Sequence, residues 1–142
     1  MGPGSINVSN AEVRFSIDLR CPDGGVLGAM AGQVREACHE IAREAGLNLE
    51  LEEIWYSEPT AFHAPMVEAV ARAAQGRGYS TEHMVSGAGH DAKHLAEVCP
   101  TGMIFVPCEG GISHNEAERI TPEQAANGAN VLLDTVLALA NG

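Results

Sequence analysis

The sequence PTGMIFVPCEGGISHNEAE, residues 100–118, joins an apolar run to a glycine pair and a single histidine. The run at residues 103–107 predicts a strand, and Gly110 and Gly111 let the backbone turn tightly before His114. Two interpretations of His114 stay open at this point. A lone loop histidine is most often a surface residue. The alternative is a metal ligand, because glycines and nearby polar groups can orient an imidazole and hold its second ring nitrogen.

The segments on either side of this run predict helices. Downstream, residues 121–124 form a T-x-x-Q capping box with proline at the first helical position, which predicts a helix running to the end of the chain. Upstream, Pro65 suits the first turn of a helix that a Gly-Arg-Gly sequence closes. A short strand, the loop SGAGHDA at residues 86–92 and a short helix are expected between the two.

The first part of the chain has a different pattern. EVRFSIDL, residues 12–19, alternates apolar and polar side chains and predicts a half-buried strand. Apolar residues then repeat every three to four positions over residues 26–45, and a glycine suited to a helix C-cap follows. Alternation returns from residue 47. The predicted order is therefore strand, helix, strand.

Two prolines in SEPTAFHAP, residues 57–65, mark the best boundary in the chain. We predict two segments, residues 6–58 and 59–142, after MGPGS at residues 1–5, which looks like a cloning remnant. The long crossover makes the two strands of the first segment parallel, and a split arrangement places another strand between them. No further strand is available in that segment, so its strand edges are expected to lack a partner.

The composition limits the classes of partner. The 142 residues carry a formal net charge of -11, which disfavours nucleic acid and anionic membranes because both attract clustered Lys and Arg. No apolar run reaches the roughly 18 residues that a membrane span needs. The four cysteines lack C-x-x-C spacing and lie in apolar segments, so buried free thiols of a reducing compartment explain them better than disulfides. We therefore expect a cytoplasmic protein.

Three further features could carry chemistry. SGAGHDAKH, residues 86–94, has a glycine-rich turn before a helix, and without a G-K-[ST] ending we favour a carboxylate over a phosphate as its ligand. His90 and His94 are four residues apart, with Asp91 between them, so a local metal site is the competing interpretation. Arg20 ends the first strand beside Asp18, where it is either an exposed or paired charge or a planar fork for a carboxylate.

Five segments occur in an order and spacing typical of one family. They are INV at residues 6–8, FSIDLR at 15–20, SGAGHDA at 86–92, PTGMIFVP at 100–107 and GGISHNEAE at 110–118. Over residues 6–141 the chain resembles the hydantoinase/carbamoylase branch of the M20 metallopeptidase-like amidohydrolases. That branch includes N-carbamoyl-L-amino-acid hydrolase, allantoate amidohydrolase and beta-ureidopropionase.

The resemblance implies a hydrolase that cleaves a C–N bond of small N-carbamoyl or ureido acids with a pair of divalent metals, Zn or else Mn, Co or Ni. The residues that it implies for the site are His114 as a metal ligand, Asn7, Arg20, Gly87, Ala88 and Gly89 as substrate-binding groups, and His90 and Asp91 as supporting groups. The other metal ligands and the general base of the family lie N-terminal to the matching region. We therefore expect no catalytic residue in this chain, and no activity from the chain alone.

The implied fold is α/β. It consists of a partial ferredoxin-like lid, with strand, helix and strand in residues 6–58, followed by the C-terminal elements of a zinc-peptidase-like α/β catalytic domain. The competing hypothesis is a non-catalytic module that dimerises or binds a partner. A homodimer through the lid segment is expected from the resemblance. A third hypothesis joins His90, His94 and His114 of two chains in a zinc site.

Overall fold

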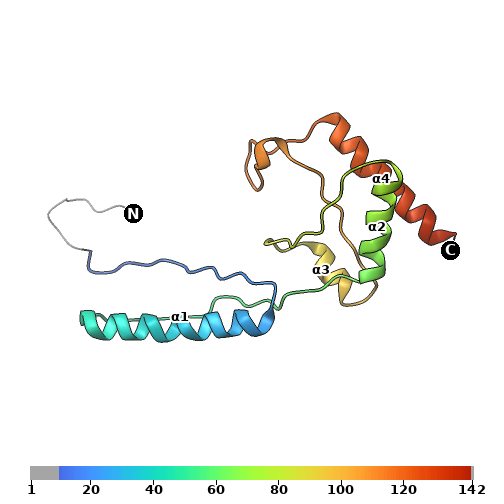
Figure 1. The fold of residues 1–142 in the computed structure, drawn as a ribbon. Coiled ribbons are helices and arrows are strands. Elements are labelled where there is room, and N and C mark those ends of the chain that lie inside the picture. The colour runs from blue at the N-terminus through green and yellow to red at the C-terminus, as the bar shows by residue number, and fades with distance from the viewer. Residues whose placement is uncertain (1–9, 142) are drawn as a thin grey trace. The chain divides into compact units, whose positions relative to one another are not determined.

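The computed structural model describes residues 10–141, and in that range it holds four α-helices and one short 3₁₀ turn. These elements are α1 (Gly24–Ala45), α2 (Ala64–Gly76), α3 (Asp91–Ala96), η1 (Glu109–Gly111) and α4 (Pro122–Ala140) (Figure 1). The chain divides into two compact units, Met1–Ser57 (unit 1) and Glu58–Gly142 (unit 2). This division falls one residue from the boundary that the two prolines predict. Asn7 and the expected cloning remnant lie outside the described residues.

Unit 1 is built on α1, which has a defined cap at each end. The side chain of Asp23 accepts a hydrogen bond of 2.8 Å from the backbone N–H of Val26, which satisfies a donor that the first turn leaves free. At the other end Gly46 adopts a φ of 65°, the left-handed conformation that ends many helices. The predicted helix is therefore confirmed, with its start two residues earlier than the apolar pattern indicates.

None of the predicted strands forms among residues 10–141. Residues 12–19, 47–56 and 103–107 have no regular secondary structure. The strand prediction is wrong for these segments because alternation needs only one buried face, whereas a strand also needs ladder hydrogen bonds to a neighbour. The first segment lacks the third strand that would supply such bonds, as its sequence indicates. The partial ferredoxin-like lid stays a prediction.

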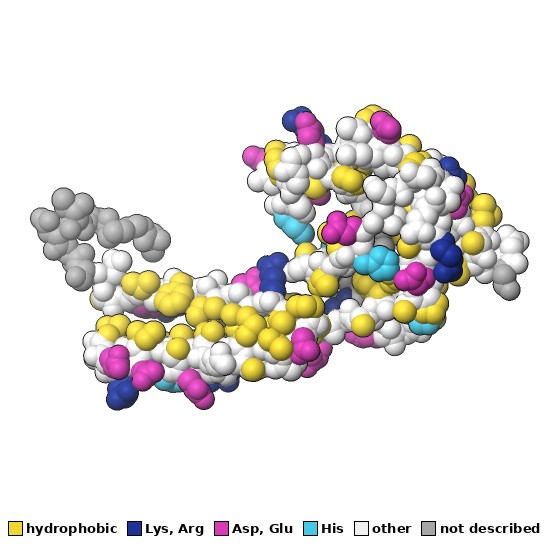
Figure 2. Space-filling view, viewed as in Figure 1, with side chains coloured by type: hydrophobic (Ala, Val, Ile, Leu, Met, Phe, Trp, Pro, Cys, Tyr) yellow, Lys and Arg dark blue, Asp and Glu magenta, His cyan; other side chains and the backbone are white. Residues whose placement is uncertain are grey.

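Unit 1 leaves a large apolar face open to solvent. Arg35 of α1 forms an ion pair of 3.6 Å with Glu53, so the segment at residues 47–56 runs along the helix. Phe15 is 76% exposed and Trp55 is 77% exposed. Figure 2 shows hydrophobic side chains gathered over α1 and the extended chain beside it. Because burial of apolar surface stabilises a fold by about 25 cal/mol per Å², this face is a surface that a partner can cover.

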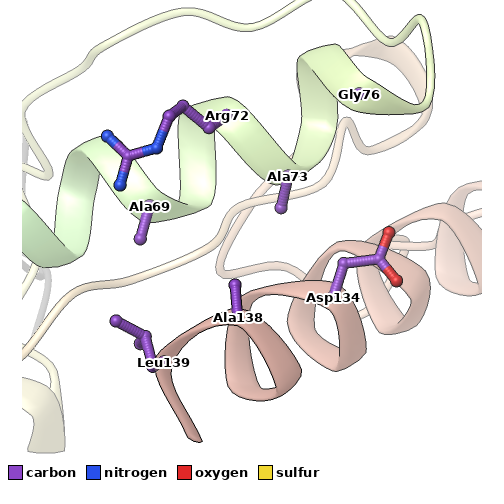
Figure 3. Close-up of a pocket in the computed structure, with 7 residues that line it drawn as sticks. All are labelled: Ala69, Arg72, Ala73, Gly76, Asp134, Ala138 and Leu139. Atoms are coloured by element: carbon purple, nitrogen blue, oxygen red, sulfur yellow. The ribbon is translucent and has the colours of Figure 1, made fainter. Parts of the chain in front are cut away.

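Unit 2 is built on the packing of α2 against α4. The small side chains of Ala69, Ala71 and Ala74 are buried on α2, and small side chains let two helices approach closely. Figure 3 shows the open groove that remains at one end of this contact, where the helices contribute Ala69, Arg72, Ala73 and Gly76 on one side and Asp134, Ala138 and Leu139 on the other.

A bidentate ion pair joins the two helices. Arg77, the residue that ends α2, donates from Nε to Oδ2 of Asp134 at 2.5 Å and from Nη2 to Oδ1 at 2.8 Å. The hydrogen bond from Arg77 is the main cause that holds the pKa of the Asp134 carboxyl below its usual 3.8. Both side chains are about one third exposed, at 32% and 34%, so solvent screens the pair only in part.

Residues 102–107 lie against α2 and α4, and a glycine allows the close approach at each helix. A Cβ on Gly128 of α4 would lie 2.5 Å from Cγ1 of Val106, and a Cβ on Gly102 would lie 3.3 Å from Cβ of Met66. The backbone N–H of His63 donates to the carbonyl of Thr101 at 3.0 Å, which ties the start of this segment to the start of α2. The extended segment is therefore fixed by helix contacts instead of by a sheet.

The remaining features agree with the sequence in part. The capping box of α4 is confirmed, because Thr121 accepts from the N–H of Gln124 and the Gln124 side chain accepts from the N–H of Thr121. The four cysteines are free, yet Cys99 is exposed and the other three are half-buried, so the expectation of buried thiols is wrong. Among the described residues, no helix has the length and apolar character that crossing a bilayer requires.

We predict that Gly128→Ala lowers the melting temperature of unit 2. Alanine favours a helix over glycine by about 1 kcal/mol, but the new methyl group would lie 2.5 Å from the stiff, β-branched Val106. Thermal unfolding followed by circular dichroism measures the change. Gly32→Ala in α1 is the matched control, because nothing lies within 4 Å of that position, and it should stabilise its helix. A Gly128→Ala variant that melts higher than the wild type would contradict the close approach.

We predict that Asp134→Asn lowers the melting temperature of unit 2 by a few degrees at pH 7 and changes it little at pH values well below 3.8. A carboxyl whose pKa is lower in the folded state stabilises the fold above its unfolded pKa, and this contribution is lost as the pH falls through the folded value. Melting curves of both proteins across this pH range give the difference. Glu82→Gln, at an exposed carboxylate, is the control. A difference that stays constant to low pH would exclude an electrostatic origin.

Candidate functional site

The loop at residues 109–119 presents His114 at its far end. Glu109 and Arg119 close the loop at its base, since the N–H of Glu109 donates to the carbonyl of Arg119 at 2.9 Å and their side chains form an ion pair of 2.6 Å. Gly110 and Gly111 have φ values of 64° and 68°. The tight turn predicted from the glycine pair is therefore confirmed.

His114 itself adopts a left-handed backbone, with a φ of 54°, which is uncommon for a residue with a side chain. Its N–H donates a hydrogen bond of 2.7 Å to Oε2 of Glu118. Asn115 stabilises the same turn, because its Oδ1 accepts from the N–H of Ala117 at 2.9 Å and its carbonyl accepts from the N–H of Glu118 at 2.9 Å. The backbone of His114 is thus fixed from both sides, and its imidazole is exposed.

The described residues bring no three His, Cys, Asp or Glu side chains together in a way that could hold a metal ion. The hypothesis of a local site at His90, His94 and Asp91 therefore finds no support within one chain. His94 instead lies 3.9 Å from Glu97 in the exposed last turn of α3. His114 fits one ligand of a metal site, because its imidazole is exposed and its backbone is fixed.

The glycine turn at residues 86–90 is closed by side chains. Oγ of Ser86 accepts from the N–H of Ala88 at 3.2 Å and lies 2.7 Å from Nε2 of His90. The His90 ring also packs edge-on against Phe105, with ring centroids 5.5 Å apart. His90 is the N-cap residue of α3, and Asp91 is the first residue of that helix. The supporting role expected for His90 and Asp91 stays a prediction.

Arg20 lies in unit 1 and is paired with Asp18. Nη2 of Arg20 contacts Oδ2 of Asp18 at 2.5 Å, and Nε contacts the same oxygen at 3.1 Å. The hydrogen bond from Arg20 is the main cause that lowers the pKa of the Asp18 carboxyl, and the pair raises the pKa of Arg20. Both side chains are 63% exposed.

The paired charge is one of the interpretations that the sequence leaves open for Arg20 beside Asp18, since residues two apart in an extended chain lie on the same face. Two contacts of the candidate site are not predicted by the sequence: Glu118 with His114, and Ser86 with His90. They depend on how irregular loops close, for which no periodic pattern exists.

Comparison with known proteins places these loops in a family. The model of peptidase family M20/M25/M40 matches residues 3–138. The chain is 44% identical over 138 residues to an N-carbamoyl-L-amino-acid amidohydrolase from Rhizobium meliloti, covering 97% of this chain and 33% of the relative. It is 33% identical over 138 residues to an allantoate amidohydrolase from Bacillus subtilis (strain 168), covering 97% of this chain and 34% of the relative.

A solved structure agrees with these relatives. An amidase of the hydantoinase/carbamoylase family from Burkholderia multivorans is similar with a TM-score of 0.79 and 50% identity, over 83% of this chain and 29% of that one. This likeness supports a zinc-peptidase-like α/β domain as the fold class, although the described residues form helices without strands. The chain spans about a third of the length of the curated relatives that it matches.

We predict that Glu118→Ala raises the exchange rate of the His114 backbone amide by roughly 3- to 10-fold, the loss expected for one hydrogen bond. The Glu118 carboxylate accepts that N–H at 2.7 Å and so holds the strained turn. Hydrogen exchange followed by NMR measures the rate. Glu116→Ala removes a neighbouring exposed carboxylate and is the control. Equal rates in the wild type and in Glu118→Ala would show that the carboxylate does not hold the loop.

Proposed function

The chain belongs to peptidase family M20/M25/M40, and we propose that it supplies the C-terminal part of a metal-dependent amidohydrolase. The proposed reaction is hydrolysis of the C–N bond of an N-carbamoyl amino acid or a related ureido acid. The observation that carries this proposal is the 44% identity to an N-carbamoyl-L-amino-acid amidohydrolase along 97% of the chain. The proposed setting is the cytoplasm, in agreement with four free cysteines.

The roles proposed for the residues are those that the resemblance to the family implies. Arg20 binds the substrate carboxylate through its planar fork, helped by Asn7. Asp18 holds that fork before substrate arrives, at distances of 2.5 and 3.1 Å. Because Asp18 and a substrate carboxylate compete for the same guanidinium, the pair orients Arg20 at some cost in affinity.

The turn at Gly87, Ala88 and Gly89 contacts the substrate through its backbone. Gly87 and Gly89 are both exposed at the surface. His90 and Asp91, which directly follow this turn in the sequence, support it at the start of α3. One glycine on each side of the small residue Ala88 allows a ligand to approach the main chain closely.

His114 is the proposed ligand of one metal of a divalent pair, which is Zn or else Mn, Co or Ni. Such a pair supplies Lewis acidity that polarises the carbonyl of the scissile bond. A catalytic zinc takes about three protein ligands, and this chain offers one candidate. We therefore propose that the chain is inactive alone, and that its own contribution is to orient one imidazole and to bind the substrate carboxylate.

The exposed apolar face of unit 1 favours a second function. Ile54 is 83% exposed and Trp55 is 77% exposed, beside α1. A non-catalytic module that dimerises through unit 1 would use this face directly, and a homodimer through the lid segment is compatible with both functions. The two functions differ in whether His114 affects a reaction.

We predict that the chain alone hydrolyses no N-carbamoyl-L-amino acid in the presence of zinc, manganese or cobalt. Mixed with the remaining N-terminal two thirds of the Rhizobium meliloti relative, it should restore turnover. His114→Ala should then reduce the rate by more than about 100-fold, the upper range for loss of a partner of a metal ligand. A colorimetric assay for the released amine measures the rate.

His39→Ala is the control for this experiment, because His39 is an exposed histidine of α1, away from both loops in sequence. A mixture in which His114→Ala is as active as the wild type would remove the proposed role of His114. A mixture without any activity, from a chain that forms dimers by light scattering, would favour the non-catalytic module.

A further inference from the structure

Ser86 is the polar side chain of the glycine turn for which the sequence predicts no role. It is half-buried, and its Oγ contacts two residues of the proposed substrate-binding turn. Oγ lies 3.2 Å from the backbone nitrogen of Ala88 and 2.7 Å from Nε2 of His90. The turn is therefore closed on itself by one hydroxyl group.

The distances favour one partner for the proton of this hydroxyl. A serine Oγ has one proton to donate and two lone pairs, and one lone pair accepts the N–H of Ala88. The proton can go to the carbonyl of Ala88 at 3.3 Å, with the second lone pair accepting from Nε2 of His90, or it can go to Nε2 itself at 2.7 Å. A distance of 3.3 Å is long for a hydroxyl donor, whereas about 2.7 Å is typical of a hydroxyl donor and short for an N–H donor. The geometry therefore favours a proton directed at Nε2.

A proton directed at Nε2 defines the tautomer of His90. A ring nitrogen that accepts a hydrogen bond carries no proton, so the neutral imidazole carries its proton on Nδ1. The ring is held on a second side by Phe105, at an interplanar angle of 66°. The backbone of His90 is fixed as well, because its carbonyl accepts the N–H of Lys93 at 2.9 Å in the first turn of α3.

We propose that Ser86 is a positioning residue, whose hydroxyl closes the 86–90 turn and holds His90 as the Nδ1–H tautomer. In this state the ring offers one N–H donor at Nδ1, and the turn backbone stays ordered for a ligand. The consequence for substrate binding rests on the proposed function. The closed turn and the tautomer are properties of this chain alone.

The first experiment measures the tautomer in the wild-type chain. Two-bond ¹H–¹⁵N correlation spectra of the ¹⁵N-labelled protein, recorded at about pH 8 where histidine is neutral, distinguish a protonated Nδ1 from a protonated Nε2. We expect His90 to carry its proton on Nδ1. A proton on Nε2 would overturn the proposal without any variant being needed.

Two variants then test whether Ser86 is the cause. Ser86→Ala should give a mixture of the two tautomers and raise the amide exchange rate of Ala88 by roughly 3- to 10-fold, since one hydrogen bond is lost. Ser86→Thr keeps the hydroxyl and should preserve both properties. Ser80→Ala removes an exposed serine of the same unit and should change neither. An unchanged tautomer and exchange rate in Ser86→Ala would assign the turn to other contacts.

These readouts do not depend on hydrolysis. If the complemented enzyme is inactive while His90 carries its proton on Nδ1, the proposed function fails and the role of Ser86 in the turn stands. If the enzyme is active while His90 carries its proton on Nε2, the role of Ser86 fails alone.

Discussion

The close approach of residues 102–107 to α4 is the constraint on which unit 2 depends. Val106 occupies the space that a side chain at position 128 would fill, with only 2.5 Å between its Cγ1 and a Cβ there. Phe105, in the same segment, contacts the ring of His90, and the loop that carries His114 begins three residues after Val106, at Glu109. The segment that packs on the helices therefore connects to both candidate loops.

The sequence predicts the fold well where the determinant is local. The capping box at residues 121–124 and the C-cap at Gly46 each depend on atoms within a few residues, and both are confirmed. The strand predicted at residues 103–107 depends on a neighbour that the described residues do not supply, so this apolar run forms an extended segment held by α2 and α4. The apolar pattern of a segment shows which side chains are buried. Whether the segment becomes a strand depends on a neighbouring strand that supplies hydrogen bonds.

The candidate site follows the same division. The glycine pair predicts a tight turn before His114, and the φ values of Gly110 and Gly111 confirm it. The sequence does not predict the left-handed backbone of His114, because this conformation depends on the Glu118 side chain accepting the His114 N–H. The contact of Ser86 with His90 is hidden for the same reason: a spacing of four residues has a fixed meaning in a helix and none in an irregular turn.

The strained backbone at His114 bears on what this chain contributes to a metal site. A non-glycine residue in the left-handed region is less stable than in the common regions, and it persists only where its surroundings hold it. Here the ion pair of Glu109 with Arg119 closes the loop, and the carboxylate of Glu118 accepts the His114 N–H. A backbone ordered in advance loses less conformational freedom when a ligand binds. Under the proposed function, unit 2 therefore supplies one imidazole from a fixed backbone, and the remaining ligands come from other segments of the enzyme.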